Sequence, residues 1–101
     1  MVPASPTSPT ICAAGAHTFT SGYQALVSAL NSLPTYPSTR SCTHTPGRSG
    51  PSYQLLFAYP EGPPVLVFIY SDCKPEIDNL SLQSNSATSI LPIIAKLLTP
   101  N

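Results

Sequence analysis

The chain has 101 residues, enough for one domain with a single core, and 42% of them are hydrophobic. Its charge is unusually low: four basic and four acidic side chains make up 8% of the residues, where about 25% is ordinary. Four scattered cations cannot neutralise the phosphates of a nucleic acid or hold an anionic membrane surface, so we expect neither partner. No window approaches the roughly 18 apolar residues that a membrane span needs.

Polarity in this chain comes from proline, serine and threonine rather than from charge, and there are 13 prolines. Such a composition suits an extracellular or cell-envelope protein, and three cysteines fit an oxidising compartment, with one bridge and one cysteine left over. The start, MVPASPTSPT, has neither the positive flank nor the apolar stretch of a signal peptide, so we expect export with the signal already removed. Residues 1–11 are predicted to be a flexible linker, and residues 12–101 a single domain.

The first predicted element is an amphipathic helix at about 21–33. Ser21 and Gln24 have the spacing of a capping box, and apolar residues then recur on one helical face. Residues 34–52 form a long connection rich in proline. Compact domains rarely contain so long a connection unless it has a functional role or is held by a covalent link. Cys42 is the candidate for a disulfide that holds it.

Two strand patterns follow this connection. Residues 53–59 alternate bulky with smaller or polar side chains, whereas residues 65–70 are apolar throughout, as expected for a central strand covered on both faces. Turn residues between them favour an antiparallel hairpin. A short third strand is predicted at 80–83 and a second amphipathic helix at about 89–98, with Pro92 in its first turn. The expected fold is α+β: a small antiparallel sheet packed by two helices, in the order α-β-β-β-α.

The cysteines flank the predicted hairpin. Cys42 precedes its first strand and Cys73 follows its second, and these two ends of an antiparallel hairpin are neighbours. A Cys42–Cys73 bridge is therefore geometrically natural and leaves Cys12 unpaired, while Cys12–Cys42 and Cys12–Cys73 stay open as alternatives. Because no two cysteines have CxxC spacing, neither a redox motif nor a zinc knuckle is indicated.

Three of the four acidic residues follow the second strand, at Asp72, Glu76 and Asp78. They lack the spacing of a calcium loop, and Pro75 between them indicates a solvated turn at the end of an apolar strand. No G-x-S-x-G occurs, and in a serine-rich chain a triad drawn on paper around His17 or His44 is expected by chance. We therefore predict no metal site, no cofactor and no enzymatic activity.

The segment 43–50 is polar and punctuated by proline and glycine, and a bridge at Cys42 would hold one end of it. Small proteins present rigid recognition surfaces on anchored loops of this kind. In such a loop, His44 or Arg48 is the side chain that a protease specificity pocket would accept.

The pattern of the chain resembles uncharacterised small secreted or lipoprotein-borne domains of high-GC Gram-positive bacteria. The matching segments are ALVSALNSLPTYP (25–37), Cys42, YQLLFAYPEGPPVLVFIY (53–70), Cys73 with Pro75, DNLSLQ (78–83) and SILPIIAKLL (89–98). This resemblance implies export and a Cys42–Cys73 pair, and it implies no activity. In size, apolar hairpin and flexible start the chain is also similar to bacterial subtilisin-type inhibitors, which generally carry two disulfides, whereas three cysteines can form one.

These features together predict a non-enzymatic, extracytoplasmic binding or interaction domain with a protein or cell-envelope partner. The alternative is a small inhibitor of a secreted serine protease, acting through the loop 43–50. A binding domain also predicts a contiguous exposed apolar or aromatic patch, including Tyr36 or Tyr59.

Overall fold

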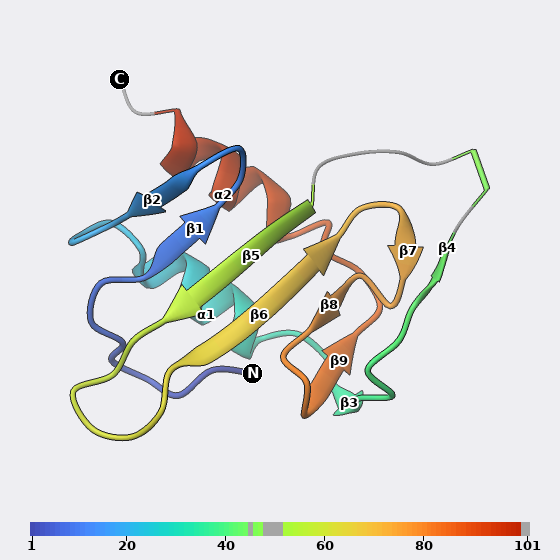
Figure 1. The fold of residues 1–101 in the computed structure, drawn as a ribbon, viewed down its shortest axis with the longest axis horizontal. Helices are drawn as coiled ribbons and strands as arrows, with labels where there is room; N and C mark the ends of the chain where they lie inside the picture. Colours follow the sequence, from blue (N-terminus) through green and yellow to red (C-terminus); the bar gives the residue numbers. More distant parts are fainter. Residues whose placement is uncertain (45, 48–51, 100–101) are drawn as a thin grey trace.

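The computed structural model describes residues 1–44, 46–47 and 52–99 (Figure 1). Its strands are β1 (Thr10–Cys12), β2 (Ala16–Thr18), β3 (Tyr36–Pro37), β4 (Thr43–His44), β5 (Ser52–Phe57), β6 (Val65–Tyr70), β7 (Cys73–Lys74), β8 (Ile77–Asp78) and β9 (Leu82–Ser84), and its helices are α1 (Gln24–Asn31) and α2 (Leu91–Leu98). Seven strands form an antiparallel sheet in the order β2-β1-β5-β6-β8-β9-β3, and β4 pairs with β7 in a separate ribbon.

The expected fold class is therefore wrong, because the domain is mostly β rather than a small three-stranded sheet in the order α-β-β-β-α. The predicted hairpin is present as β5 and β6, but unpredicted strands extend it on both sides. On one side β1 pairs with β5, and on the other β8 pairs with β6. Strands of two or three residues are too short to show an alternation of apolar and polar residues in the sequence. They form because neighbouring strands are available to pair with them.

The predicted third strand begins two residues later and ends one residue later than expected. It runs as β9 from Leu82 to Ser84, and it pairs with β8 and β3. The preceding residues turn because Asn79 Oδ1 accepts hydrogen bonds from the backbone N–H groups of Ser81 (2.9 Å) and Leu82 (2.7 Å). An asparagine side chain that replaces backbone partners in this way favours a turn over a strand.

Both predicted helices are present but start later than expected. α1 begins at Gln24 with Tyr23 at its N-cap, and no side chain caps it, so the predicted capping box of Ser21 is wrong. α2 begins at Leu91, and Pro92 lies in its first turn as predicted. Both helices lie behind the sheet in Figure 1. They therefore cover one face of it and leave the other uncovered by helix in the described part of the chain.

The hydrophobic core lies between this sheet face and the helices. From the strands it contains Ile11, Leu55, Phe57, Val67, Ile69 and Ile77, and from the helices and the residues before α2 it contains Leu26, Leu30, Ala87, Ile90 and Ile94. Fully burying one large aliphatic or aromatic side chain contributes about 1.5–3 kcal/mol, so this layer stabilises the sheet and the helices together.

Residues 1–11, expected to be a flexible linker, lie against the domain. Val2 is buried in the core, and Asn31 Oδ1 accepts hydrogen bonds from the N–H groups of Met1 (2.7 Å) and Val2 (2.8 Å). Further along, the Tyr59 hydroxyl donates to the carbonyl of Pro3 (2.8 Å). The segment then enters the sheet as β1, so the structure places these residues within the domain.

Candidate binding face

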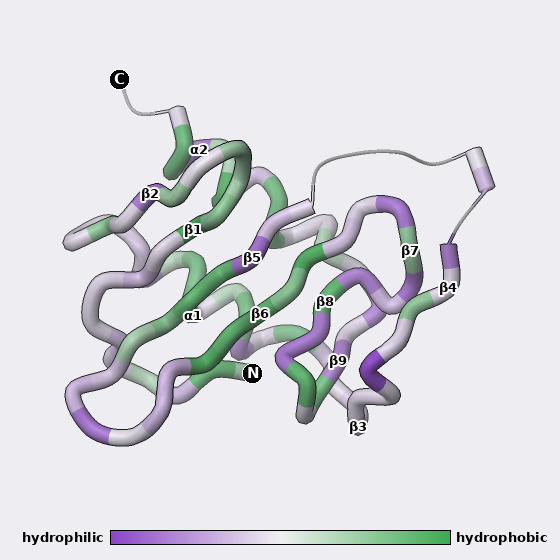
Figure 2. The backbone as a smooth tube through the Cα atoms, viewed as in Figure 1, coloured by the Kyte–Doolittle hydropathy of each residue, from purple (hydrophilic) through white to green (hydrophobic). Residues whose placement is uncertain are grey.

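Strand β6 is apolar on both of its faces, but only one of them is covered. Val67 and Ile69 are buried beneath the helices, whereas Leu66, Phe68 and Tyr70 are half-buried on the opposite side. The prediction that this strand is covered on both faces is therefore wrong. A continuous apolar run of residues contains no alternation that could have revealed this. Figure 2 shows the hydrophobic path of β6 across the middle of the sheet.

Neighbouring strands complete this uncovered surface, which we call the open face. Across β5 and β6, Leu56 is opposite Leu66, Gln54 opposite Phe68, and Ser52 opposite Tyr70, and β1 adds Cys12 opposite Gln54. Paired residues in antiparallel strands point to the same side of a sheet. Leu56 retains 39% of its surface exposed. The register also aligns Tyr36 with Gln83, Asp78 and Phe68, so Tyr36 lies on this side of the sheet and is 37% exposed. Tyr59 instead packs against the core.

An aromatic pair forms the centre of the open face. The rings of Phe68 and Tyr70 are parallel within 1°, and their centroids are 6.1 Å apart. They come from alternate positions of one strand and so stand on one side of the sheet. Both rings line two hollows, one of about 470 Å³ beside the β1–β2 turn and one of about 380 Å³ beside residues 40–42. The pair is thus a ridge between two depressions.

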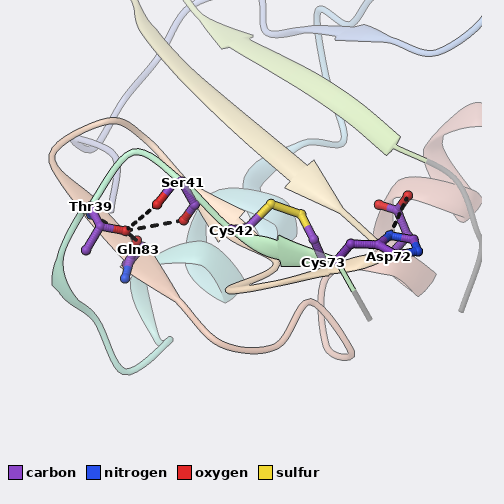
Figure 3. The surroundings of a disulfide bond; sticks show 7 residues. Thr39, Ser41, Cys42, Asp72, Cys73 and Gln83 are labelled. Carbon is purple, nitrogen blue, oxygen red and sulfur yellow. Dashed lines mark hydrogen bonds and ion pairs between the residues drawn. A yellow bond between two sulfur atoms is a disulfide. The ribbon is translucent and has the colours of Figure 1, made fainter. Parts of the chain in front are cut away.

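The second hollow has a wall held by the predicted bridge, since Cys42 is bonded to Cys73. That pairing is confirmed. Figure 3 shows the bridge between the end of the segment 39–42 and the start of β7. Hydrogen bonds hold the rest of the segment: among them, the Thr39 N–H donates to Gln83 Oε1 (3.2 Å), and Arg40 Nε donates to the carbonyl of Leu80 (3.1 Å). The wall is therefore tied covalently at one end and by hydrogen bonds along its length.

Two acidic residues expected in a solvated turn are buried. Asp78 is 7% exposed, and its Oδ1 accepts hydrogen bonds from the hydroxyl of Ser38 and the N–H of Leu80, both at 2.7 Å. Glu76 is 3% exposed, and its Oε1 accepts from the N–H of Ala87 at 2.7 Å. The prediction of a solvated turn is therefore wrong for both residues. Burial of these carboxylates is tolerated because N–H and O–H groups donate hydrogen bonds to them.

Asp78 also acts on the open face. Burial raises the pKa of the Tyr70 hydroxyl above its usual value, and the negative charge of Asp78 raises it further. The phenol is therefore neutral at physiological pH and can both donate and accept a hydrogen bond there. A partner of this surface meets two aromatic rings and one neutral hydroxyl, with no formal charge on either ring.

The predicted recognition loop is described only in part. His44 lies on β4, and its Nδ1 is 4.0 Å from Asp72 Oδ2 in a largely exposed pair. Arg48 lies outside the described residues, and the inhibitor hypothesis, which offers His44 or Arg48 to a specificity pocket, stays a prediction. Cys12 is the free cysteine and lines the first hollow. His17 is exposed on the edge strand β2.

Neither a metal centre nor a membrane span is found within the described residues. No group of three or more histidine, cysteine, aspartate and glutamate side chains there could hold an ion. Similarly, neither described helix is long and apolar enough to cross a bilayer.

No family model, no curated protein and no solved structure matches this chain. The function is therefore inferred from the geometry of the structure.

Proposed function

We propose that this protein is a non-enzymatic, extracytoplasmic binding domain that engages a protein or cell-envelope partner through the open face. The observation that carries the proposal is the parallel Phe68–Tyr70 pair, uncovered between two hollows. Aromatic side chains are enriched among the residues that dominate binding energy at interfaces, where they fill pockets on the partner. An extended apolar patch on a sheet surface is also typical of an interaction site.

The character of the open face defines the kind of partner. Its strands β1, β5 and β6 present aliphatic, aromatic or neutral polar side chains. Two charged residues line the second hollow: Asp78, which is buried and satisfied by hydrogen bonds, and Arg40, whose Nε donates to the carbonyl of Leu80. A neutral surface with apolar groups would therefore bind the strands of this face more favourably than a highly charged one, because Arg40 is the one cation among the described residues of the second hollow and could compensate the desolvation of few charges. The bridge supports an extracytoplasmic location, because disulfides persist in oxidising compartments.

Rigidity supports the same proposal. β6 lies in the middle of the sheet, paired with β5 along its whole length and with β8 at Phe68 and Ile69. The Cys42–Cys73 bridge then holds the neighbouring wall. A surface whose shape is already formed loses little conformational entropy on binding, which increases affinity.

The test is capture of secreted and cell-envelope proteins by the oxidised full chain, followed by a dissociation constant for each purified partner. Leu56→Lys places a charge on the open face at a partly exposed position and is expected to weaken binding at least tenfold. Phe68→Ala removes one ring of the pair and is expected to do the same. Ser28→Lys, at an exposed position of α1, is the matched control and should bind like the wild type. Equal binding by all four proteins would overturn the proposal.

A further inference from the structure

A third hollow lies on the helix side of the molecule, away from the open face. It has a volume of about 750 Å³ and is lined by Phe19, Ser21, Gly22, Ala25, Pro92, Ile93, Lys96 and Leu97. We call it the helix groove, because its walls come from the start of α1 and from α2. Its volume falls in the range of roughly 300–1,000 Å³ that is common for small-molecule sites.

The walls of the helix groove are apolar. Phe19, Ile93 and Leu97 are half-buried and keep part of their surface accessible in the groove. Ala25 is exposed on α1, so the groove is open to solvent along that helix. An apolar trough of this kind favours a ligand with a hydrocarbon portion, because transfer of that portion from water is favourable.

Two polar side chains interrupt this apolar lining. Lys96 forms no ion pair or hydrogen bond with any other residue of the described part of the chain. Ser21 does not cap α1, and its hydroxyl is likewise without a hydrogen-bond partner within the described residues. The described acidic residues near a cation lie elsewhere, with Glu76 beside Lys74 and Asp72 beside His44. Among the described residues, the groove therefore offers a cation and a hydroxyl with no anion to meet them.

We propose that the helix groove binds a single-chain anionic amphiphile of the free fatty-acid type. The alkyl chain lies between Phe19, Ile93 and Leu97, and the carboxylate pairs with the Lys96 ammonium. Charge complementarity selects this ligand: the hydrocarbon matches the apolar walls, and the anion matches the one cation of the lining. This site is separate from the open face and does not depend on the function proposed for it.

The expected binding has two separable components. Each methylene added to the chain should raise affinity about threefold to fourfold while it still fits between the walls. The carboxylate should add about twofold to fivefold over an uncharged head group, as expected for a largely exposed ion pair. A cationic head group of the same chain length should bind more weakly than either, because it meets Lys96.

The experiment titrates decanoate, dodecanoate, decanol and decyltrimethylammonium into the full-length oxidised protein, each below its micelle concentration, by calorimetry and by amide NMR. We expect saturable one-to-one binding of the carboxylates, with shifts confined to residues 19–25 and 92–97. Lys96→Met keeps the apolar stem, and should weaken decanoate twofold to fivefold while leaving decanol unchanged.

A pair of matched variants on α1 tests the location. Ala25→Glu places a carboxylate at the wall and should weaken decanoate at least tenfold, whereas Ser28→Glu, one turn away and outside the groove, should have no effect. The amide spectrum of each variant shows whether it is folded, and a variant that is unfolded is replaced by Ala25→Gln with an expected smaller loss.

Four results would overturn the proposal: no saturable binding of either carboxylate, shifts that map to the open face, equal effects of Lys96→Met on decanoate and decanol, or binding to anionic lipid vesicles alone. A protein that forms dimers through the groove, seen as loss of the dimer in Ala25→Glu by sedimentation, would equally reject a fatty acid as its occupant.

Discussion

Asp78 lies directly opposite Phe68 across β6 and β8, so a buried carboxylate adjoins the aromatic pair of the open face. It accepts hydrogen bonds from Ser38, two residues before Arg40, and from Leu80, and both Arg40 and Leu80 line the second hollow. Asp78 is thus a largely buried charged residue, 7% exposed, in the lining of the second hollow. Stability and binding should both respond when this residue is changed.

Asp78→Ala should lower the free energy of unfolding by about 2–4 kcal/mol, because it leaves a hydroxyl and a backbone N–H without their charged acceptor. Asp78→Asn keeps one acceptor oxygen and should cost less. The control is Asp72→Ala, which breaks a largely exposed pair with His44 and should change stability by about 0–1 kcal/mol. Urea unfolding measures all three, and equal losses for Asp78→Ala and Asp72→Ala would contradict the structure.

Stability should fall at alkaline pH, and Tyr70 should contribute to the fall. Burial, followed by the charge of Asp78, raises the pKa of Tyr70 above the ordinary 10.0. A raised pKa means that the folded state holds the phenol proton more tightly than the unfolded state. The contribution of Tyr70 to stability is therefore fully present below pH 10.0, and it is lost as the pH rises through the pKa of the folded state.

The measurement for Tyr70 is urea unfolding at pH 9 and pH 11. Tyr70→Phe keeps the ring and removes the titration, so its loss of stability over this interval should be smaller than that of the wild type. Absorbance of the phenolate assigns the pKa directly. An identical loss in the variant and the wild type would show that Tyr70 does not contribute.

Removal of the disulfide should lower stability by about 3–4 kcal/mol in the chain-entropy model, since the bridged residues are 31 apart in the sequence. The double variant Cys42→Ser, Cys73→Ser tests this by urea unfolding, and Cys12→Ser is the control that leaves the bridge intact. Alkylation with mass detection should label one cysteine in the native protein and three after reduction. Three labels without reductant would rule out the bridge.

Val2→Ala should destabilise the domain by about 1–2 kcal/mol, because it removes buried methyl groups from the core. Ala4→Ser, at an exposed position of the same segment, should change stability by less than about 0.5 kcal/mol. If residues 1–11 were instead a free linker, thermal unfolding would give the same midpoint for both variants.

Local patterns in the sequence were sufficient for the elements that carry their own signal. The β5–β6 hairpin follows from two apolar runs around a turn, and both helices follow from apolar residues repeating at 3.6-residue spacing. The Cys42–Cys73 bridge followed from the neighbouring ends of that hairpin. The hairpin and the helices depend on residues near one another in the chain, which is why the sequence could predict them. The bridge joins residues 31 apart, and the sequence favoured it without excluding a pairing with Cys12.

Tertiary structure alone decided the size of the sheet, the exposed side of β6 and the state of the acidic residues. β1 and β8 form because a long hairpin offers them edges to pair with, and neither has a periodic pattern of its own. Asp78 is buried because Ser38, 40 residues earlier, supplies a hydroxyl to it. β6 is apolar on both faces, and the helices cover only one of them. Phe68 and Tyr70, on the other face, therefore form a candidate binding surface.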